Sequence, residues 1–201
     1  MKWVHQVLLG SLVAAVLGCA NVPTQEMSDA RQALKAAKNV RAEQYAFFVL
    51  QQSEQALTQA EENLQAGLFH QAREEAVLAK EEALRAYEMA IAIENAQIIW
   101  QTISTLFYSE NDIDELLKKA RTAAQQGDVE NTVQFANKAY EQGEKLLNQI
   151  YLERAHLLIN KLKAITLSAD VLLILKKAEQ AYREQEGKRA YELVHPLIKS
   201  H

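Results

Sequence analysis

Residues 60–79 read AEENLQAGLFHQAREEAVLA, and residues 120–139 read ARTAAQQGDVENTVQFANKA. In each stretch a glycine, Gly67 or Gly127, has an alanine seven positions before it and alanines nine and twelve positions after it. A glycine just past a helical segment is typical of a helix C-terminus, and alanines let two helices approach closely. The two stretches therefore predict a repeated helical hairpin.

The rest of the chain also predicts helix. Six glycines and two prolines among 201 residues are few, and both residue types disfavour helix interiors. A third glycine, Gly187, with Ala178 nine positions before it, indicates a less regular third hairpin. The fold class is therefore all-α, an antiparallel bundle of repeated hairpins with about seven helices, two of them long. We expect them at 25–38, 47–65, 69–107, 112–127, 129–165, 168–187 and 188–198.

Several residues mark the expected helix ends. Asp112, with Glu115 three residues later, resembles a capping box and is expected as an N-cap. Ser168 is expected to cap the sixth helix in the same position. Pro196 is expected to kink or shorten the last helix, because proline lacks the backbone donor that a helix interior requires.

The first 18 residues, MKWVHQVLLGSLVAAVLG, read as an export signal. Lys2 provides a short positive region, and the apolar run from Val7 to Leu17 has the length of a secretory signal rather than of a membrane span. The run ends in Val16-Leu-Gly18-Cys19, which resembles the lipobox of bacterial lipoproteins. That resemblance implies cleavage after Gly18 and lipid attachment to Cys19.

Two features bear on where the mature protein is held. Ala20 stands where many lipoproteins of the inner membrane carry aspartate, so the resemblance favours the periplasmic face of the outer membrane. Residues 19–24 then form the lipidated cysteine and a short tether. The alternatives are cleavage after Ala20 as an ordinary export site, which would release a soluble protein from Asn21, and a retained, buried Cys19.

The segment from Val22 to Ala92 resembles the domain of unknown function family 4398 of bacterial lipoproteins. The residues that carry the resemblance are Glu26–Ala33, Glu43–Ala46, Ala60–Gly67 and Gln71–Ala76, with Phe47 where the family usually has proline. The resemblance implies a helical, envelope-located domain and no activity. Some members continue into an OmpA-like peptidoglycan-binding domain, but here the remaining residues predict helices, so peptidoglycan binding is not supported. We expect a family-like helical domain over 25–110 and a second helical hairpin region over 111–201.

Residue patterns for catalysis or metal binding are not found. His70, His156, His195 and His201 have no histidine or cysteine three or four positions away, so no metal site is predicted. There is no nucleophile motif or phosphate-binding glycine loop, so we expect neither an enzyme nor a cofactor. A net charge of −4 gives no reason for nucleic-acid binding. Residues 21–110, with 7 basic and 13 acidic side chains, are compatible with a basic partner.

The most apolar part of the mature chain is the predicted site. Ile99, Trp100, Ile103 and Phe107 cover more than one face of their helix, whereas a helix on one side of a bundle needs a single apolar stripe. We therefore expect a partner-helix surface or dimer seam there. The predicted function is a structural or protein-interaction module of the cell envelope, with other envelope proteins as partners. The alternative is a helical-bundle carrier of a small or hydrophobic ligand.

Overall fold

The computed structural model describes residues 22–106, 111–165 and 168–199, and every regular element in these ranges is an α-helix. The expected all-α class is confirmed. The helices are α2 (Thr24–Asn39), α3 (Ala42–Tyr45), α4 (Phe47–Gln65), α5 (Phe69–Thr105), α6 (Asn111–Gln125), α7 (Val129–Lys163), α8 (Ala169–Arg183) and α9 (Gly187–Lys199).

The chain divides into two compact units, one ending at Ala90 and the other beginning at Ile91. The division falls inside α5, which is 37 residues long. The break between two expected helices predicts a division at residue 110. Packing contacts divide the chain 20 residues earlier, and each unit is described separately below.

Most helix ends lie within two residues of those expected, but α8 ends at Arg183, four residues before the expected end. Three other details differ. The short helix α3 was not expected; it follows Arg41, whose φ is 60°. Asp112 is not the N-cap of α6, because the helix already begins at Asn111 and Asp112 lies in its first turn. Ser168 occupies the N-cap position of α8, but its side chain makes no capping hydrogen bond.

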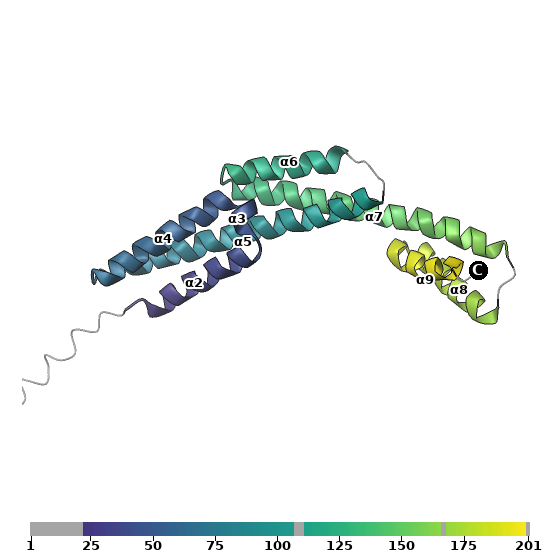
Figure 1. Ribbon diagram of the computed structural model, residues 1–201, viewed down its shortest axis with the longest axis horizontal. Helices are drawn as coiled ribbons and strands as arrows, with labels where there is room; N and C mark the ends of the chain where they lie inside the picture. Colours follow the sequence, from purple (N-terminus) through teal and green to yellow (C-terminus); the bar gives the residue numbers. More distant parts are fainter. Residues whose placement is uncertain (1–21, 107–110, 166–167, 200–201) are drawn as a thin grey trace, which may run out of the picture. The chain divides into compact units, whose positions relative to one another are not determined.

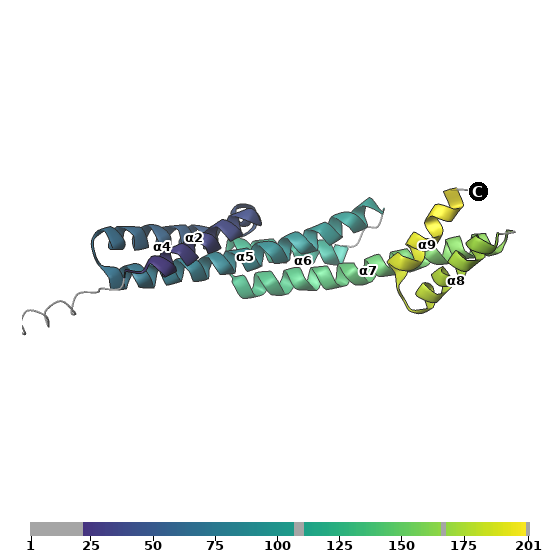
Figure 2. The same cartoon turned by 90° about the horizontal axis from the view of Figure 1, so that it is seen from below.

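In unit 1, α2, α4 and the first part of α5 pack side by side (Figures 1 and 2). Ion pairs between these helices show the directions in which they run relative to one another. Arg31 contacts Glu61 and Lys38 contacts Glu54, so α2 runs antiparallel to α4. On the other side of α2, Glu26 contacts Arg73 at 2.7 Å and Asp29 contacts Lys80 at 2.8 Å. In these two pairs the residue numbers rise along both helices, from 26 to 29 in α2 and from 73 to 80 in α5, so α2 runs parallel to α5.

The core of unit 1 consists mainly of alanine methyl groups. Ala30 of α2, Ala56 of α4 and Ala79 of α5 pack together, and Met27 packs on Ala60 and Ala76. Small side chains allow short distances between helix axes. Ser53 Oγ is fully buried there and donates a hydrogen bond of 2.7 Å to the carbonyl oxygen of Ala79, which joins α4 to α5 directly.

In unit 2, α6 packs on the first half of α7, and α8 and α9 pack on its second half (Figure 1). The end of α5 joins the first group. One core cluster draws Ala96 and Ile103 from α5, Ile113 and Leu117 from α6, and Ala139 and Ile150 from α7. The other clusters draw on α7, α8 and α9 and contain the buried residues Ala155, Ile159, Leu162, Leu175, Ala178, Ala181, Ala190 and Val194.

The α4–α5, α6–α7 and α8–α9 hairpins share one turn geometry. In each, the backbone N–H after a left-handed residue donates to a carbonyl five positions earlier: Leu68 to Asn63 at 2.9 Å, Asp128 to Ala123 at 3.0 Å, and Glu186 to Ala181 at 2.9 Å. This is the Schellman pattern, which satisfies carbonyls at a helix end. A fully buried alanine, Ala60, Ala120 or Ala178, lies seven positions before each left-handed residue.

The left-handed residue of the third turn is Gln185, with φ of 61°, and not Gly187. The repeat interval is therefore 60 residues from Gly67 to Gly127 and 58 from Gly127 to Gln185. Gly187 is instead the first residue of α9. Ala178 lies seven positions before Gln185, just as Ala60 and Ala120 lie seven positions before Gly67 and Gly127. The third hairpin therefore matches the first two more closely than the position of Gly187 indicated.

Candidate interaction surface

The apolar residues predicted as an interaction surface lie mostly inside unit 2. Ile103 is fully buried, and Ile99 and Trp100 are half-buried against the α5–α6–α7 cluster. Phe107 lies outside the described residues. Two helices, α6 and α7, pack on this part of α5, and this accounts for an apolar surface wider than one stripe. Ile98, next to Ile99 in α5, is exposed over 53% of its surface.

The close contact between α5 and α7 depends on Gly143. A Cβ atom at this position would overlap Cγ2 of Ile99 and would lie 3.5 Å from Cδ1 of Ile103. The glycine therefore lets the backbone of α7 approach the side chain of Ile99. Gly143 lies inside α7, and its packing role is visible only with α5 in place.

A different apolar surface is exposed on the part of α5 that belongs to unit 1. Val77, Leu84 and Tyr87 are 41%, 50% and 38% exposed. Positions seven apart differ by about 20° around a helix, and positions three apart are neighbours on its surface. The three side chains therefore form one face, which we call the α5 face. Apolar residues seven positions apart mark this face in the sequence, but the run around Trp100 farther along α5 is more apolar.

The α5 face is bordered by carboxylates. Glu81 and Glu88 are exposed and lie about 40° around the helix from Val77 and Leu84 respectively. Lys80 lies within the face, between Val77 and Leu84, and is held by Asp29 of α2, so its charge is already paired. An exposed apolar strip with an acidic edge matches an amphipathic partner helix that carries lysine or arginine beside its own apolar residues.

The outer face of α4 in the same unit has the opposite character. It forms a shallow depression of about 450 Å³ lined only by long or polar side chains, Gln51, Glu54, Gln55, Thr58, Gln59 and Glu62. Phe47 and Phe48 in the first turn of α4 are exposed, but the depression itself offers no apolar anchor of the kind that dominates protein interfaces. It is therefore a matched internal control for the α5 face.

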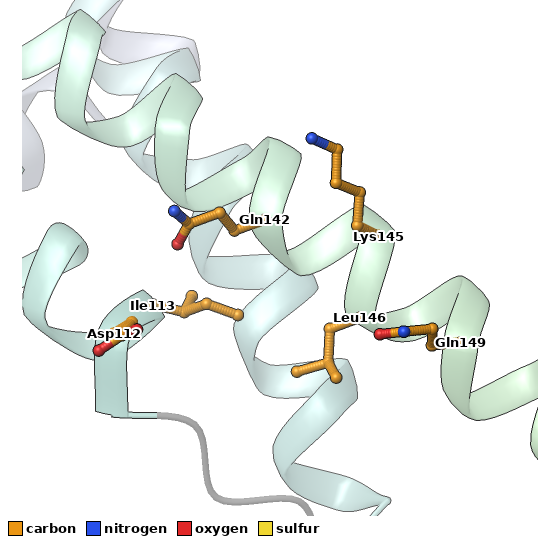
Figure 3. A pocket seen from close by; sticks show the side chains of 6 residues that line it. All are labelled: Asp112, Ile113, Gln142, Lys145, Leu146 and Gln149. Carbon is orange, nitrogen blue, oxygen red and sulfur yellow. The ribbon is translucent and has the colours of Figure 1, made fainter.

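A depression of about 280 Å³ lies between α6 and α7 in unit 2 (Figure 3). Asp112 and Ile113 of α6 line one side, and α7 contributes Gln142, Lys145, Leu146 and Gln149. It opens to solvent and its apolar lining is limited to Ile113 and Leu146. A carrier of hydrophobic ligands needs a concave, mostly apolar pocket, so this depression does not favour the carrier interpretation.

The three histidines of the described residues contact side chains of their own helices. His70 pairs with Glu74, His156 lies 3.0 Å from the Asn160 amide, and His195 stacks on Tyr191. Within the described ranges no group of three or more histidine, cysteine, aspartate or glutamate side chains is placed to hold a metal ion. Every buried side-chain nitrogen or oxygen described has a hydrogen-bond partner.

The residues predicted for lipid attachment, Gly18 and Cys19, lie outside the described residues, and their role stays a prediction. Among the helices described, none is long and apolar enough to cross a membrane.

No protein-family model, curated protein or solved structure matches the sequence. The resemblance to the domain of unknown function family 4398 therefore remains a prediction that rests on the residues of this chain.

Proposed function

We propose that the protein is an exported lipoprotein, attached through Cys19 to the periplasmic face of the outer membrane, and that it acts there as a protein-interaction module. The leader sequence supports the attachment. The α5 face supports the interaction role, and it is the observation that carries this part of the proposal. Val77, Leu84 and Tyr87 are exposed on one side of a helix whose opposite side is buried.

The partner is an envelope protein that presents an amphipathic helix with a basic edge. Its apolar residues cover Leu84 and Tyr87, and its lysine or arginine side chains lie opposite Glu81 and Glu88. Charged residues at the edge of an interface mainly accelerate and orient association, whereas buried apolar anchors supply most of the affinity. Complex formation is therefore expected to depend strongly on Leu84 and to respond to salt through the two glutamates.

The test of the interaction places a photo-crosslinking amino acid at single positions of the full-length protein in its own envelope. Position 84, on the α5 face, is expected to give one discrete protein adduct. Position 58, on the polar face of α4, serves as the control and is expected to give none. Adducts at both positions, or at neither, would refute the α5 face as the partner surface.

A second variant, Glu88→Lys, tests the acidic edge. Glu88 is exposed, so its replacement leaves the core of unit 1 unchanged and is expected to reduce the adduct at position 84 severalfold. An undiminished adduct would show that the partner carries no basic edge.

The attachment is tested by the intact mass of the mature amino terminus isolated from the envelope. An acylated fragment that begins at Cys19 is expected. An unmodified terminus at Asn21 would overturn the lipid anchor and leave the protein soluble in the periplasm.

A further inference from the structure

The chain is fixed in unit 1 from Pro23 onward. The Pro23 side chain is among the fully buried ones, and its carbonyl accepts a hydrogen bond of 3.1 Å from the N–H of Met27, which is itself buried. The N–H of Thr24 donates to the carbonyl of Val22 at 2.8 Å. The position of Pro23 therefore determines which part of unit 1 is nearest to a lipid carried by Cys19.

Pro23 lies at the end of unit 1 that contains the α4–α5 turn. Glu26 of α2 contacts Arg73 of α5, and Met27 packs on Ala60 and Ala76, which lie on the two sides of that turn. The opposite end of the unit contains α3, because Lys38 near the end of α2 contacts Glu54 near the start of α4.

The reach of the chain between Cys19 and Pro23 can be compared with the length of unit 1. Pro23 is four positions after Cys19, which gives a reach of at most about 14 Å for an extended chain. Helix α4, with 19 residues, is about 28 Å long. The lipid can therefore reach the α4–α5 turn directly, whereas the α3 end lies about twice that distance from Pro23.

The end nearest to the anchor presents two exposed apolar side chains. Val22 is 41% exposed and Leu68 is 46% exposed. The backbone of Leu68 is held in the turn by the bond from its N–H to the Asn63 carbonyl and by the bond that its own carbonyl accepts from Ala72. The side chain therefore projects from a fixed backbone.

We propose that this end of unit 1 rests on the lipid surface, with Val22 and Leu68 in contact with the headgroup region. The inference rests on the proposed lipid anchor and adds the face that the anchor brings to the bilayer. The contact is apolar: the side chains offered are a valine and a leucine.

The test uses full-length acylated protein in vesicles of phosphatidylethanolamine and phosphatidylglycerol. A polarity-sensitive fluorophore is attached to a cysteine introduced by His70→Cys, next to the turn, or by Gln44→Cys, on α3. Both native side chains are exposed, and acylation blocks the thiol of Cys19. Lipids with a nitroxide in the headgroup region are expected to quench the fluorophore at position 70 at least threefold more than the one at position 44.

Two further variants separate contact from proximity. Insertion of twelve glycine and serine residues after Ala20 is expected to reduce the quenching at position 70 toward the value at position 44. Leu68→Ser is expected to reduce it at least twofold, because this change removes the apolar contact and leaves both backbone hydrogen bonds in place.

The outcomes distinguish the two proposals. An intact mass that shows no acyl chain on Cys19 overturns the lipid anchor and this orientation together. An acylated protein with equal quenching at positions 70 and 44 overturns the orientation alone. Unchanged quenching in Leu68→Ser overturns the apolar contact.

Discussion

The side-chain amide of Asn148, in the middle of α7, accepts a hydrogen bond of 2.9 Å from the backbone N–H of Gly187, the first residue of α9. The same amide donates a bond of 3.0 Å to the carbonyl of Gln185. A Cβ atom at position 187 would lie 2.7 Å from Oδ1 of Asn148. One side chain of α7 thus holds both sides of the α8–α9 turn, and the glycine provides the space for it.

Asn148→Ala should destabilise the α8–α9 hairpin. The variant removes the acceptor that serves an N–H at a helix start, and loss of such a cap costs about 1 kcal/mol. Urea unfolding followed by circular dichroism measures the change. Asn148→Asp keeps the acceptor for the Gly187 N–H but places a carboxylate oxygen against the Gln185 carbonyl, so it should recover only part of the loss. Equal unfolding midpoints for the parent and Asn148→Ala would contradict the bridging role.

Gly143→Ala should also destabilise unit 2, although alanine is the better helix former by about 1 kcal/mol. The added methyl would overlap Cγ2 of Ile99, an atom bonded to Cβ and unable to move far. Overpacking of this kind costs about 1–3 kcal/mol.

The combination of Gly143→Ala with Ile99→Ala tests whether the strain comes from overlap with the Ile99 side chain. If the clash is with Ile99, the pair should be more stable than the sum of the single effects predicts. Strict additivity of the two free energies of unfolding would place the strain elsewhere.

Asp128 should make the stability of the α6–α7 hairpin depend on pH. Its carboxylate accepts hydrogen bonds from the side-chain amide and the backbone N–H of Asn131, at 2.6 Å and 3.0 Å. These bonds, the side-chain one first, hold the pKa of Asp128 below its usual range. A lowered folded-state pKa means that the contribution is present above the unfolded-state pKa, about 3.9, and is lost as the pH falls through the folded-state value.

Asp128→Asn retains an acceptor for the helix start and does not titrate. The difference in urea midpoint between the parent and this variant should therefore shrink as the pH falls from 6 to 3. The other carboxylates titrate in both proteins and cancel in the comparison. A difference that stays constant over this range would exclude the Asp128 carboxylate as the source.

Ala76→Leu and Val77→Leu should have very different effects, although the residues are adjacent. Ala76 is fully buried beside Met27 and Ala60, whereas Val77 is 41% exposed. A leucine at position 76 must push α2 away from α5, at a cost of about 1–3 kcal/mol. The surface change should stay within about 0.5 kcal/mol. Thermal unfolding of both variants measures the contrast, and similar losses would argue against the close packing of unit 1.

The helices were predictable because their signals are local. Gly67 and Gly127 mark two Schellman turns by residue type, and both have positive φ as expected. Gln185 takes the same conformation without a residue that favours it, so the third turn was misplaced by two residues. Arg41 behaves in the same way before α3.

The candidate site was less predictable because burial depends on which helices meet. Ile103 and Leu84 are both apolar residues of α5, yet the first is covered by α6 and α7 and the second is half exposed. The pairing of Asn148 with Gly187 joins positions 39 residues apart and leaves no periodic signal in the sequence. Such relationships require the tertiary arrangement.

The alanine core of unit 1 has a calorimetric consequence. A methyl group removes less apolar area from water than a leucine or phenylalanine side chain does, and the heat-capacity change of unfolding scales with that area. Unit 1 should therefore unfold with a small heat-capacity increment for its length, and its stability should change only gently with temperature. Steric size, more than hydrophobicity, then decides which substitutions its interior accepts.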